Sequence, residues 1–253
     1  MKTHEPYLKG GLQVSVIKVN HIQKGYGKTK VLDEVSLSVE KGQIYGFIGP
    51  SGAGKTTLIK LIAGMELVDD GEVYVLGSKM PSLPVLQDVG YMAQSDALYL
   101  QLTGKENLAF FASLFKLTKK QQKDRISYAA GLVNLTDDLD KKVAAYSGGM
   151  KRRLSLAISL LQDPQILILD EPTVGIDPEL RLSIWNELLR LKKEEGKTII
   201  VTTHVMDEAE RCDFIALIRN GSILANGTPS ELKDLYHAQN IDEVFLNAGR
   251  SKQ

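Results

Sequence analysis

The sequence predicts an α/β fold in which a sheet-based core carries a second, helical lobe. Two observations indicate this fold. Strand-length apolar segments alternate with segments of helical periodicity along the 253 residues. Residues 102–135 then keep a helical pattern between two predicted strands, which indicates a lobe inserted into the sheet domain. A chain of this length can bury a full hydrophobic core.

The strands of the core are expected over residues 14–22, 31–39, 43–48, 72–76, 89–93, 165–169 and 198–202. The first two alternate apolar and polar residues, which predicts half-exposed strands, and a glycine-punctuated loop over residues 23–29 joins them. Near the C-terminal end, Asn220 and Gly221 predict the turn of a hairpin between residues 214–219 and 222–225.

Helices are expected over residues 55–64, 150–161, 178–193 and 206–211. In the first of them the apolar residues are Leu58, Ile59, Leu61 and Ile62. In the helical lobe one apolar stripe is predicted from Leu108, Phe111, Leu114 and Phe115. Such stripes indicate the faces that helices bury.

Composition narrows the class of protein. Lysine plus arginine equals aspartate plus glutamate, at 31 each, so no net field draws the chain to nucleic acid or anionic lipid. The apolar runs are too short for a membrane span, and residues 1–13 lack the apolar region of a secretory signal. Cys212 is the single cysteine, which excludes an internal disulfide, fits a reducing cytosol and is interpreted as a small residue beside a helix. We therefore expect a cytosolic chain, which can act at a membrane through a partner.

A glycine-rich loop follows the strand over residues 43–48 and opens a helix. Its nucleotide-binding residues are predicted as Gly49, Pro50, Ser51, Gly52, Ala53, Gly54, Lys55, Thr56 and Thr57. The glycines let backbone N–H groups point inward, and the helix N-terminus adds partial positive charge where phosphate would sit. Lys55 is expected to reach the β- and γ-phosphates, and the Thr56 hydroxyl to ligate Mg²⁺. A purely structural turn is disfavoured by this strand-loop-helix context.

Two carboxylates, Asp170 and Glu171, follow the apolar strand over residues 165–169, at the end where open parallel sheets bind ligands. Asp170 is suited to the second coordination shell of Mg²⁺, where it would contact the ion through a water molecule. Glu171 is then free to orient and deprotonate an attacking water. The alternative is that both carboxylates cap the turn that follows them.

Three single residues add weaker predictions. Gln94 follows the strand over residues 89–93, from which its amide could reach both the metal and the attacking water. His204 follows the strand over residues 198–202 and could donate a hydrogen bond to the γ-phosphate. Tyr26, in the predicted loop ahead of the phosphate site, could stack on adenine. Taken alone, the first is typical of a surface glutamine and the second of a structural histidine.

A second candidate phosphate surface consists of Ser147, Gly148 and Gly149, at the start of a basic helix. It offers a hydroxyl, two unshielded amides and a helix N-terminus. The alternative is a helix cap, which the three residues favour when taken alone. The charges that follow, on Lys151, Arg152 and Arg153, are expected to form a solvated face.

In this order, the motifs resemble the nucleotide-binding subunit of an ABC transporter over residues 16–232. The order is Tyr26, the phosphate loop, Gln94, Ser147 to Gly149, Asp170 to Thr173, a loop containing Gly175, Ile176 and Asp177, and then His204. Lys55 and Ser147 are 147 − 55 = 92 positions apart, which leaves room for one helical lobe but not for the coiled-coil insertion of chromosome-maintenance ATPases.

The resemblance implies an ABC ATPase fold: a P-loop NTPase core with a mixed sheet, an N-terminal antiparallel β subdomain and an inserted helical lobe. Its ATPase domain would span residues 14–235, with a RecA-like core over 14–93 and 162–235, the lobe over 95–161 and a short tail over 236–253. No extended regulatory domain is expected after Leu232.

The resemblance also implies a head-to-tail homodimer or heterodimer that binds two ATP molecules with Mg²⁺. The phosphate loop of one copy and Ser147 to Gly149 of the other would close on each ATP, with Asp177 crossing the interface. Glu171 would be the catalytic base, assisted by Gln94 and His204, and Thr56, Gln94 and Asp170 would hold the metal. The lobe from Gln94 through Phe115 would receive a polytopic permease at the cytoplasmic face of the membrane, and no nucleic-acid partner is expected.

Two departures from the usual family pattern refine the expected function. Tyr146 and Met150 replace a leucine and a glutamine that commonly flank the Ser-Gly-Gly turn, and Gly175 and Ile176 precede Asp177 in place of alanine and leucine. These variants resemble a bacterial exporter branch that includes antibiotic-resistance and linearmycin- or daunorubicin-type pumps. The alternative is a soluble ABC-type ATPase that is not coupled to transport. A third hypothesis, a sensor that does not hydrolyse nucleotide, is disfavoured because Glu171 and His204 are both present.

Overall fold

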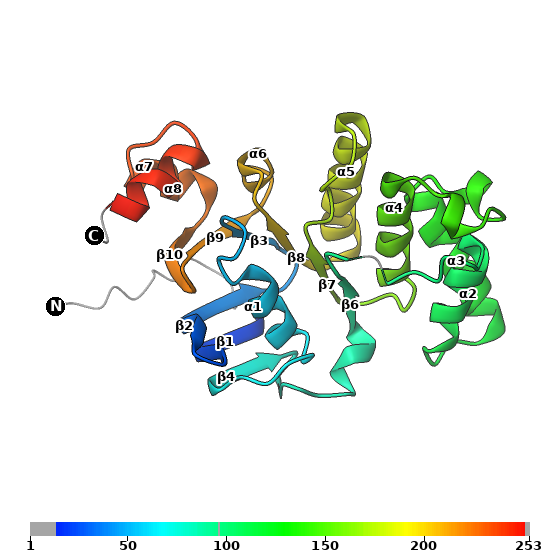
Figure 1. Ribbon diagram of the computed structural model, residues 1–253, viewed down its shortest axis with the longest axis horizontal. Helices are drawn as coiled ribbons and strands as arrows, with labels where there is room; N and C mark the ends of the chain where they lie inside the picture. Colours follow the sequence, from blue (N-terminus) through cyan, green and yellow to red (C-terminus); the bar gives the residue numbers. More distant parts are fainter. Residues whose placement is uncertain (1–13, 96, 251–253) are drawn as a thin grey trace.

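The computed structural model describes residues 14–95 and 97–250, which form two sheets with helices between and around them (Figure 1). Residues 1–13, where no secretory signal is expected, lie outside the described residues, as do Asp96 of the predicted lobe and the last three residues of the tail. Within the described ranges, no helix combines the length and the apolar character needed to cross a membrane.

The N-terminal sheet is antiparallel, in the order β2-β1-β4-β5. Its strands are β1 (Ser15–Tyr26), β2 (Thr29–Glu40), β4 (Asp70–Val75) and β5 (Ser78–Lys79). The loop predicted over residues 23–29 is wrong, because strand pairing continues to Tyr26 opposite Thr29. Gly27, at φ 58°, and Lys28 alone make the turn. Tyr26 is therefore the last residue of a strand.

The second sheet is mixed, in the order β10-β9-β3-β8-β7-β6, and only β10 runs antiparallel to its neighbour. Its strands are β3 (Ile44–Ile48), β6 (Val89–Met92), β7 (Ile166–Asp170), β8 (Thr198–Thr203), β9 (Phe214–Arg219) and β10 (Ser222–Gly227). The predicted hairpin is confirmed. Asn220 and Gly221 both have positive φ, at 49° and 76°, as a two-residue turn of the primed type requires.

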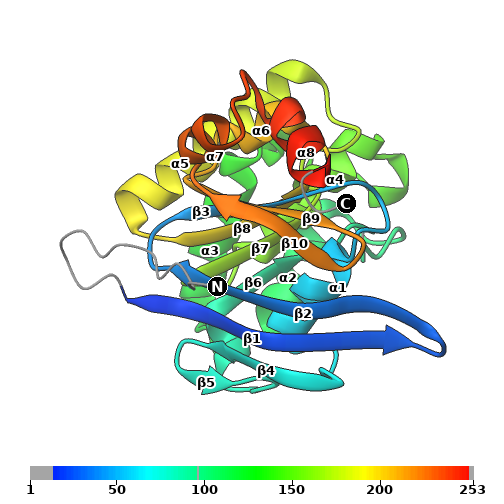
Figure 2. The same ribbon diagram turned by 90° about the vertical axis from the view of Figure 1, so that its left-hand side faces the viewer.

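The mixed sheet is buried on both faces, which explains its continuous apolar runs. In β3, Ile44 and Ile48 belong to one core cluster, and Tyr45 and Phe47 belong to the other. Helix α1 (Lys55–Ile62) packs between the two sheets (Figure 2). Its four predicted apolar residues are all buried. Helices α5 (Pro178–Glu195) and α6 (Met206–Ala209) cover the opposite face.

The helical lobe gathers α2 (Gly104–Ser113), α3 (Lys119–Leu132) and α4 (Gly148–Ser159) at one end of the molecule (Figure 1). Thr103 and Thr118 begin α2 and α3 with capping boxes, so the pattern over 102–135 is two helices. The predicted stripe holds at Leu108, which is buried, and fails at Leu114. That residue is the C-cap of α2 and is 60% exposed.

The remaining elements are three 3₁₀ turns and two C-terminal helices. They are η1 (Val85–Asp88), η2 (Thr136–Asp138), η3 (Val143–Ala145), α7 (Pro229–Leu235) and α8 (Ile241–Arg250). Helix α8 lies in the predicted tail and buries Ile241 and Val244, at the end of the molecule opposite the lobe (Figure 1).

The parallel strands β3, β8, β7 and β6 are neighbours, so their carboxyl ends meet at one edge of the sheet. From that edge continue the phosphate loop, His204, Glu171 and Gln94 respectively. The topology thus collects residues that are more than 150 positions apart in sequence at one place.

Candidate functional site

The phosphate loop connects β3 to α1 in a conformation that requires glycine. At Gly49 an added Cβ would lie 2.1 Å from the Ile218 carbonyl oxygen, and Gly54 has φ 104°. Gly54 is the N-cap of α1, and no side chain caps this helix. Its first amides are therefore directed into the loop, where a phosphate could accept from them.

Lys55 begins α1 and reaches back across the loop. Its Nζ donates to the carbonyl oxygens of Gly49, at 2.8 Å, and Pro50, at 3.0 Å. Burial lowers the pKa of the Lys55 ammonium, and the carboxylates of Glu171 and Asp170 oppose this shift. An anion bound in the loop would add to that opposing effect and favour the charged form.

Asp170, at the end of β7, is fully buried and accepts two hydroxyl hydrogen bonds. Thr56 Oγ1 donates to its Oδ2 at 2.9 Å, and Thr202 Oγ1 donates to its Oδ1. The carboxylate therefore joins the first helix to the centre of the sheet. It faces the phosphate loop and does not cap the turn after it.

Glu171 is held on both carboxylate oxygens. Gln94 Nε2 donates to Oε2 at 3.1 Å, and His204 Nδ1 lies 3.1 Å from Oε1. An ionised carboxylate only accepts, so the histidine donates from Nδ1. The Glu171 backbone has φ 51°, and its N–H donates to Thr202 Oγ1 at 3.0 Å. The predicted alternative, in which both carboxylates cap the following turn, is wrong.

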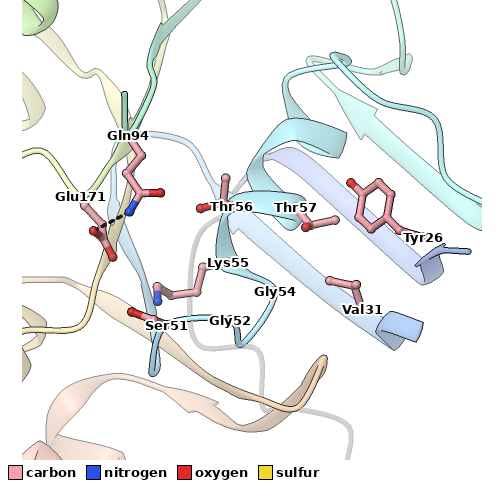
Figure 3. Close-up of a pocket in the computed structure, with 10 residues that line it drawn as sticks. All are labelled: Tyr26, Val31, Ser51, Gly52, Gly54, Lys55, Thr56, Thr57, Gln94 and Glu171. Carbon is pink, nitrogen blue, oxygen red and sulfur yellow. Dashed lines mark hydrogen bonds between the residues drawn. The ribbon is translucent and has the colours of Figure 1, made fainter. Parts of the chain in front are cut away.

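Gln94, Glu171, Tyr26 and residues of the phosphate loop line a hollow of about 360 Å³. Figure 3 shows Gln94 and Glu171 on one side, Tyr26 on the other, and the phosphate loop with Lys55 between them. Tyr26 is 47% exposed, and its hydroxyl donates to Glu66. The hollow has the polarity expected of a nucleotide site, with charged groups at one end and an aromatic ring at the other.

The oxygen donors fit a magnesium ion that shares its coordination with a nucleotide. Among the described residues, no group of three or more His, Cys, Asp or Glu could hold a metal. Thr56 and Asp170 are in contact, however, and the Gln94 amide contacts the neighbouring Glu171. Hydroxyl, carboxylate and amide oxygens are hard ligands, and Mg²⁺ commonly takes only one or two carboxylates beside substrate phosphates.

Ser147, Gly148 and Gly149 lie apart from Lys55 and the phosphate loop. Ser147 is the N-cap of α4, and its Oγ accepts from the Met150 amide at 3.2 Å, so the predicted cap is present. Nothing lies within 4 Å of a Cβ built on Gly148 or Gly149. Asp177 is likewise an exposed N-cap, of α5, and accepts from Leu180 N at 3.0 Å.

A second hollow, of about 350 Å³, begins where the first one ends. Gln94 and Glu171 line both hollows. The other residues around the second are Gly148, Arg152, Val174 and Gly175. The phosphate loop and Gly148 of the second candidate anion surface therefore line two hollows that share one pair of side chains.

The unusual Tyr146 has a structural explanation. Its ring is buried, and its hydroxyl donates to the Asp138 carbonyl oxygen at 2.8 Å. This contact ties the residue before the Ser147 cap to the lobe.

Sequence reasoning missed Thr202 and misplaced Arg152. Thr202 bonds both Asp170 and the Glu171 amide, and its position at the carboxyl end of a buried strand was the available signal. The solvated face predicted for Arg152 is wrong, because the residue is only 6% exposed. Arg152 lies four positions before the buried Leu156, on the inward stripe of α4, and that spacing could have identified it.

Comparison with known proteins gives consistent matches. The family model described as ABC transporter matches residues 32–174. The chain is 41% identical over 241 residues to the Nod factor export ATP-binding protein I of Rhizobium meliloti (strain 1021), covering 94% of this chain and 72% of that protein. It is 40% identical over 232 residues to ABC transporter G family member 20 of Dictyostelium discoideum, covering 91% of this chain but only 32% of that longer protein.

Solved structures agree with the sequence matches. An ATP-binding subunit of an ABC transporter superposes with a TM-score of 0.84 at 27% identity, covering 93% of this chain and 100% of the other. A dimeric ATP-binding cassette, in a post-hydrolysis state with ADP and Pi, superposes with a TM-score of 0.78 at 25% identity, covering 84% and 98%. The mixed sheet with its antiparallel partner sheet and helical lobe is thus the cassette fold that the sequence predicts.

Proposed function

This chain belongs to the ABC transporter family as an ATP-binding cassette that hydrolyses ATP, and we propose that two such cassettes join head to tail and power a membrane exporter. The observation that carries the proposal is the separation of the two anion surfaces. The phosphate loop and Glu171 of one chain line one hollow, whereas Gly148 lines a second hollow that shares only Gln94 and Glu171 with the first. A second chain can complete each site.

Within one chain, we propose that the loop amides and Lys55 hold the β- and γ-phosphates while the Tyr26 ring stacks on adenine. Thr56, Asp170 and Gln94 would hold Mg²⁺, which neutralises phosphate charge when bound. Besides Lys55 and Thr56, the loop residues Ser51, Gly52, Gly54 and Thr57 line the hollow.

The proposed reaction is attack of a water oxygen on the γ-phosphorus, with cleavage of the bond from that phosphorus to the β-γ bridging oxygen. The water proton goes to Glu171, and ADP and phosphate leave. Gln94 and His204 hold the two Glu171 oxygens, which supports a fixed orientation for this base. His204 can also donate from Nε2 to the γ-phosphate if both ring nitrogens carry protons.

From the second chain, we propose that Ser147, Gly148, Gly149 and Asp177 close on this nucleotide. Each lies at an exposed helix start, where amides and partial positive charge favour an anion or a facing backbone. The pairing is compatible with a homodimer, because this chain offers both surfaces, and with a heterodimer whose second cassette also offers both.

The contact with a polytopic permease is proposed at the lobe. A mostly apolar groove of about 230 Å³ lies beside Gln94, between the lobe and the sheet, and is lined in part by Met65, Tyr91, Phe111 and Ile158. This groove supports binding of a short permease helix at the cytoplasmic face of the membrane. Export is the proposed direction, supported by the exporter-like variants around Met150 and by the similarity to the Nod factor export protein of Rhizobium meliloti.

Glu171→Gln tests the catalytic proposal. The variant keeps the shape of the site but removes the base, so we expect ATP turnover to fall by at least about a hundredfold and ATP to hold a dimer together. Turnover and size-exclusion profiles measure the two effects, with Glu179→Gln, an exposed change in the first turn of α5, as the matched control. Undiminished turnover in Glu171→Gln would reject the assignment. Activity without any associated polytopic membrane protein in the native host would favour a soluble ATPase.

A further inference from the structure

Arg152 connects two parts of the molecule that the proposed function keeps separate. It lies in the second turn of α4, four residues after Gly148, and is 6% exposed. Its Nη1 donates to the carbonyl oxygens of Ala93, at 2.7 Å, and Gln94, at 2.9 Å. Its Nη2 donates to the carbonyl oxygens of Asp170 and Glu171, the latter at 2.7 Å.

The position of these four carbonyl groups matters. Strands β6 and β7 pair in parallel, and their last register pair is Met92 with Leu169. Arg152 bridges the two segments that continue from these strands, directly beyond that pair, where the sheet hydrogen bonds between β6 and β7 end. A planar guanidinium can serve two neighbouring segments at once with fixed geometry, which a lysine ammonium cannot do.

Both bridged segments carry side chains of the candidate catalytic site. Gln94 and Glu171 extend from the backbone that Arg152 holds, and they meet at 3.1 Å. Glu171 also keeps a left-handed backbone, at φ 51°, which is unfavourable for a residue that is not glycine. The hydrogen bond to its carbonyl oxygen helps to maintain that conformation.

We propose that Arg152 is a positioning residue that aligns Gln94 and Glu171 with the N-terminus of α4. The inference rests on the proposed function, because it assigns Glu171 the role of the base. Gly148 and Arg152 line the same hollow as Gln94 and Glu171. An anion bound at Ser147 to Gly149 that displaces the N-terminus of α4 therefore also displaces Gln94 and Glu171 of the same chain. In the proposed dimer that anion belongs to the nucleotide on the partner's phosphate loop, whereas Gln94 and Glu171 act on the nucleotide bound to their own chain.

Arg152→Lys tests this role because it keeps the positive charge and removes the fork. We expect kcat to fall by about tenfold or more, while KM for ATP stays within about twofold, since small misplacement of a catalytic group is costly. Arg153→Lys is the matched control. Arg153 is the neighbour on α4, and its Nη1 donates to Val133 and Asn134 in the lobe, at 3.2 and 2.8 Å. We expect its kcat to stay within about threefold of the unaltered chain.

A double-variant cycle with Gln94→Ala separates positioning from general stability. If Arg152 acts through Gln94 and Glu171, kcat of the double variant should lie no more than about twofold below kcat of the less active single variant. Multiplicative losses, an unchanged kcat, or parallel losses of kcat, ATP affinity and Tm would overturn the proposal. Arg152→Gln is the second variant, and failure of both variants to fold would assign Arg152 to stability alone. ATP turnover of the unaltered chain and of Glu171→Gln is measured in the same series. If these two turnover rates do not differ, the proposed function fails, and that outcome is distinct from a failure of the Arg152 proposal.

Discussion

The phosphate loop and the Ser147 turn use the same physics in opposite settings. Each places glycine amides at the start of a helix. The phosphate loop is enclosed by Lys55, Glu171 and Gln94 of its own chain, whereas Gly148 and Gly149 face open space. Gly54 has no side-chain cap, while Ser147 caps its own helix.

The difference teaches which surface is complete within one chain. The enclosed site can bind nucleotide without a second chain, because its backbone amides and the Lys55 ammonium group all come from one chain. The exposed turn offers amides and a hydroxyl. We therefore expect changes in the first surface to abolish binding, and changes in the second to abolish only the step that needs two chains.

The largest effect is expected from Lys55→Ala. It removes the ammonium group that bonds Gly49 and Pro50 and faces the phosphate position. We expect ATP binding by the isolated chain and ATP turnover both to fall by at least about a hundredfold. Equilibrium binding of a fluorescent ATP analogue and phosphate release measure the two quantities. Lys60→Ala, which alters a half-exposed lysine on the same helix, is the control. Retained binding in Lys55→Ala would show that the enclosed surface is not the nucleotide site.

A smaller and more selective effect is expected from Gly148→Asp. The new side chain has room, because nothing lies within 4 Å of the Cβ position, so folding should be preserved. Its negative charge opposes a phosphate from the partner chain. We expect turnover to fall by about tenfold to a hundredfold while ATP binding by the single chain changes by less than about twofold. Equal losses of binding and turnover would contradict the division between the surfaces. Gly131→Asp, at an open position in α3, controls for added charge.

Mixing the two variants sharpens the comparison further. A dimer of Lys55→Ala with Gly148→Asp has one site in which both changes meet and one site that contains neither. We expect the turnover of an equal mixture to exceed that of either variant alone and to reach about a quarter of that of the unaltered chain, if the chains pair at random and the sites act independently. Phosphate release across a titration of one variant into the other gives the readout. No recovery at any ratio would argue against head-to-tail pairing or for an obligatory requirement for two intact sites.

The sequence allowed the enclosed surface to be predicted more fully than its surroundings. The loop, Asp170, Glu171, Gln94 and His204 were each predicted at the end of a strand, where open parallel sheets bind ligands, and the resemblance to ABC cassettes assigned them to one nucleotide site. Arg152 was misjudged because a charged residue near a helix start is usually solvated. Its burial depends on where β6 and β7 stop pairing.

Two smaller errors had the same origin. The loop around Tyr26 was predicted from its glycines, but pairing with β2 extends the strand to that residue. Leu114 has the spacing of a core residue and is exposed, because α2 ends before it. The pairing partner in the first case and the end of the helix in the second are both features that local periodicity does not report.

The smallest expected effect concerns the far end of the enclosed surface. Tyr26 lies with its hydroxyl bonded to Glu66 and with Lys24 Nζ 5.5 Å from its ring centroid, so neighbouring groups fix the ring. Tyr26→Ala should raise KM for ATP by about threefold to tenfold, as loss of one aromatic stacking contact implies, with kcat within about twofold. Tyr26→Phe keeps the ring and should raise KM by no more than about threefold. Inhibition by inorganic tripolyphosphate, which has no base, should be the same in all three proteins. A change in tripolyphosphate inhibition that matches the change in KM would mean that Tyr26 supports the phosphate loop instead of the base.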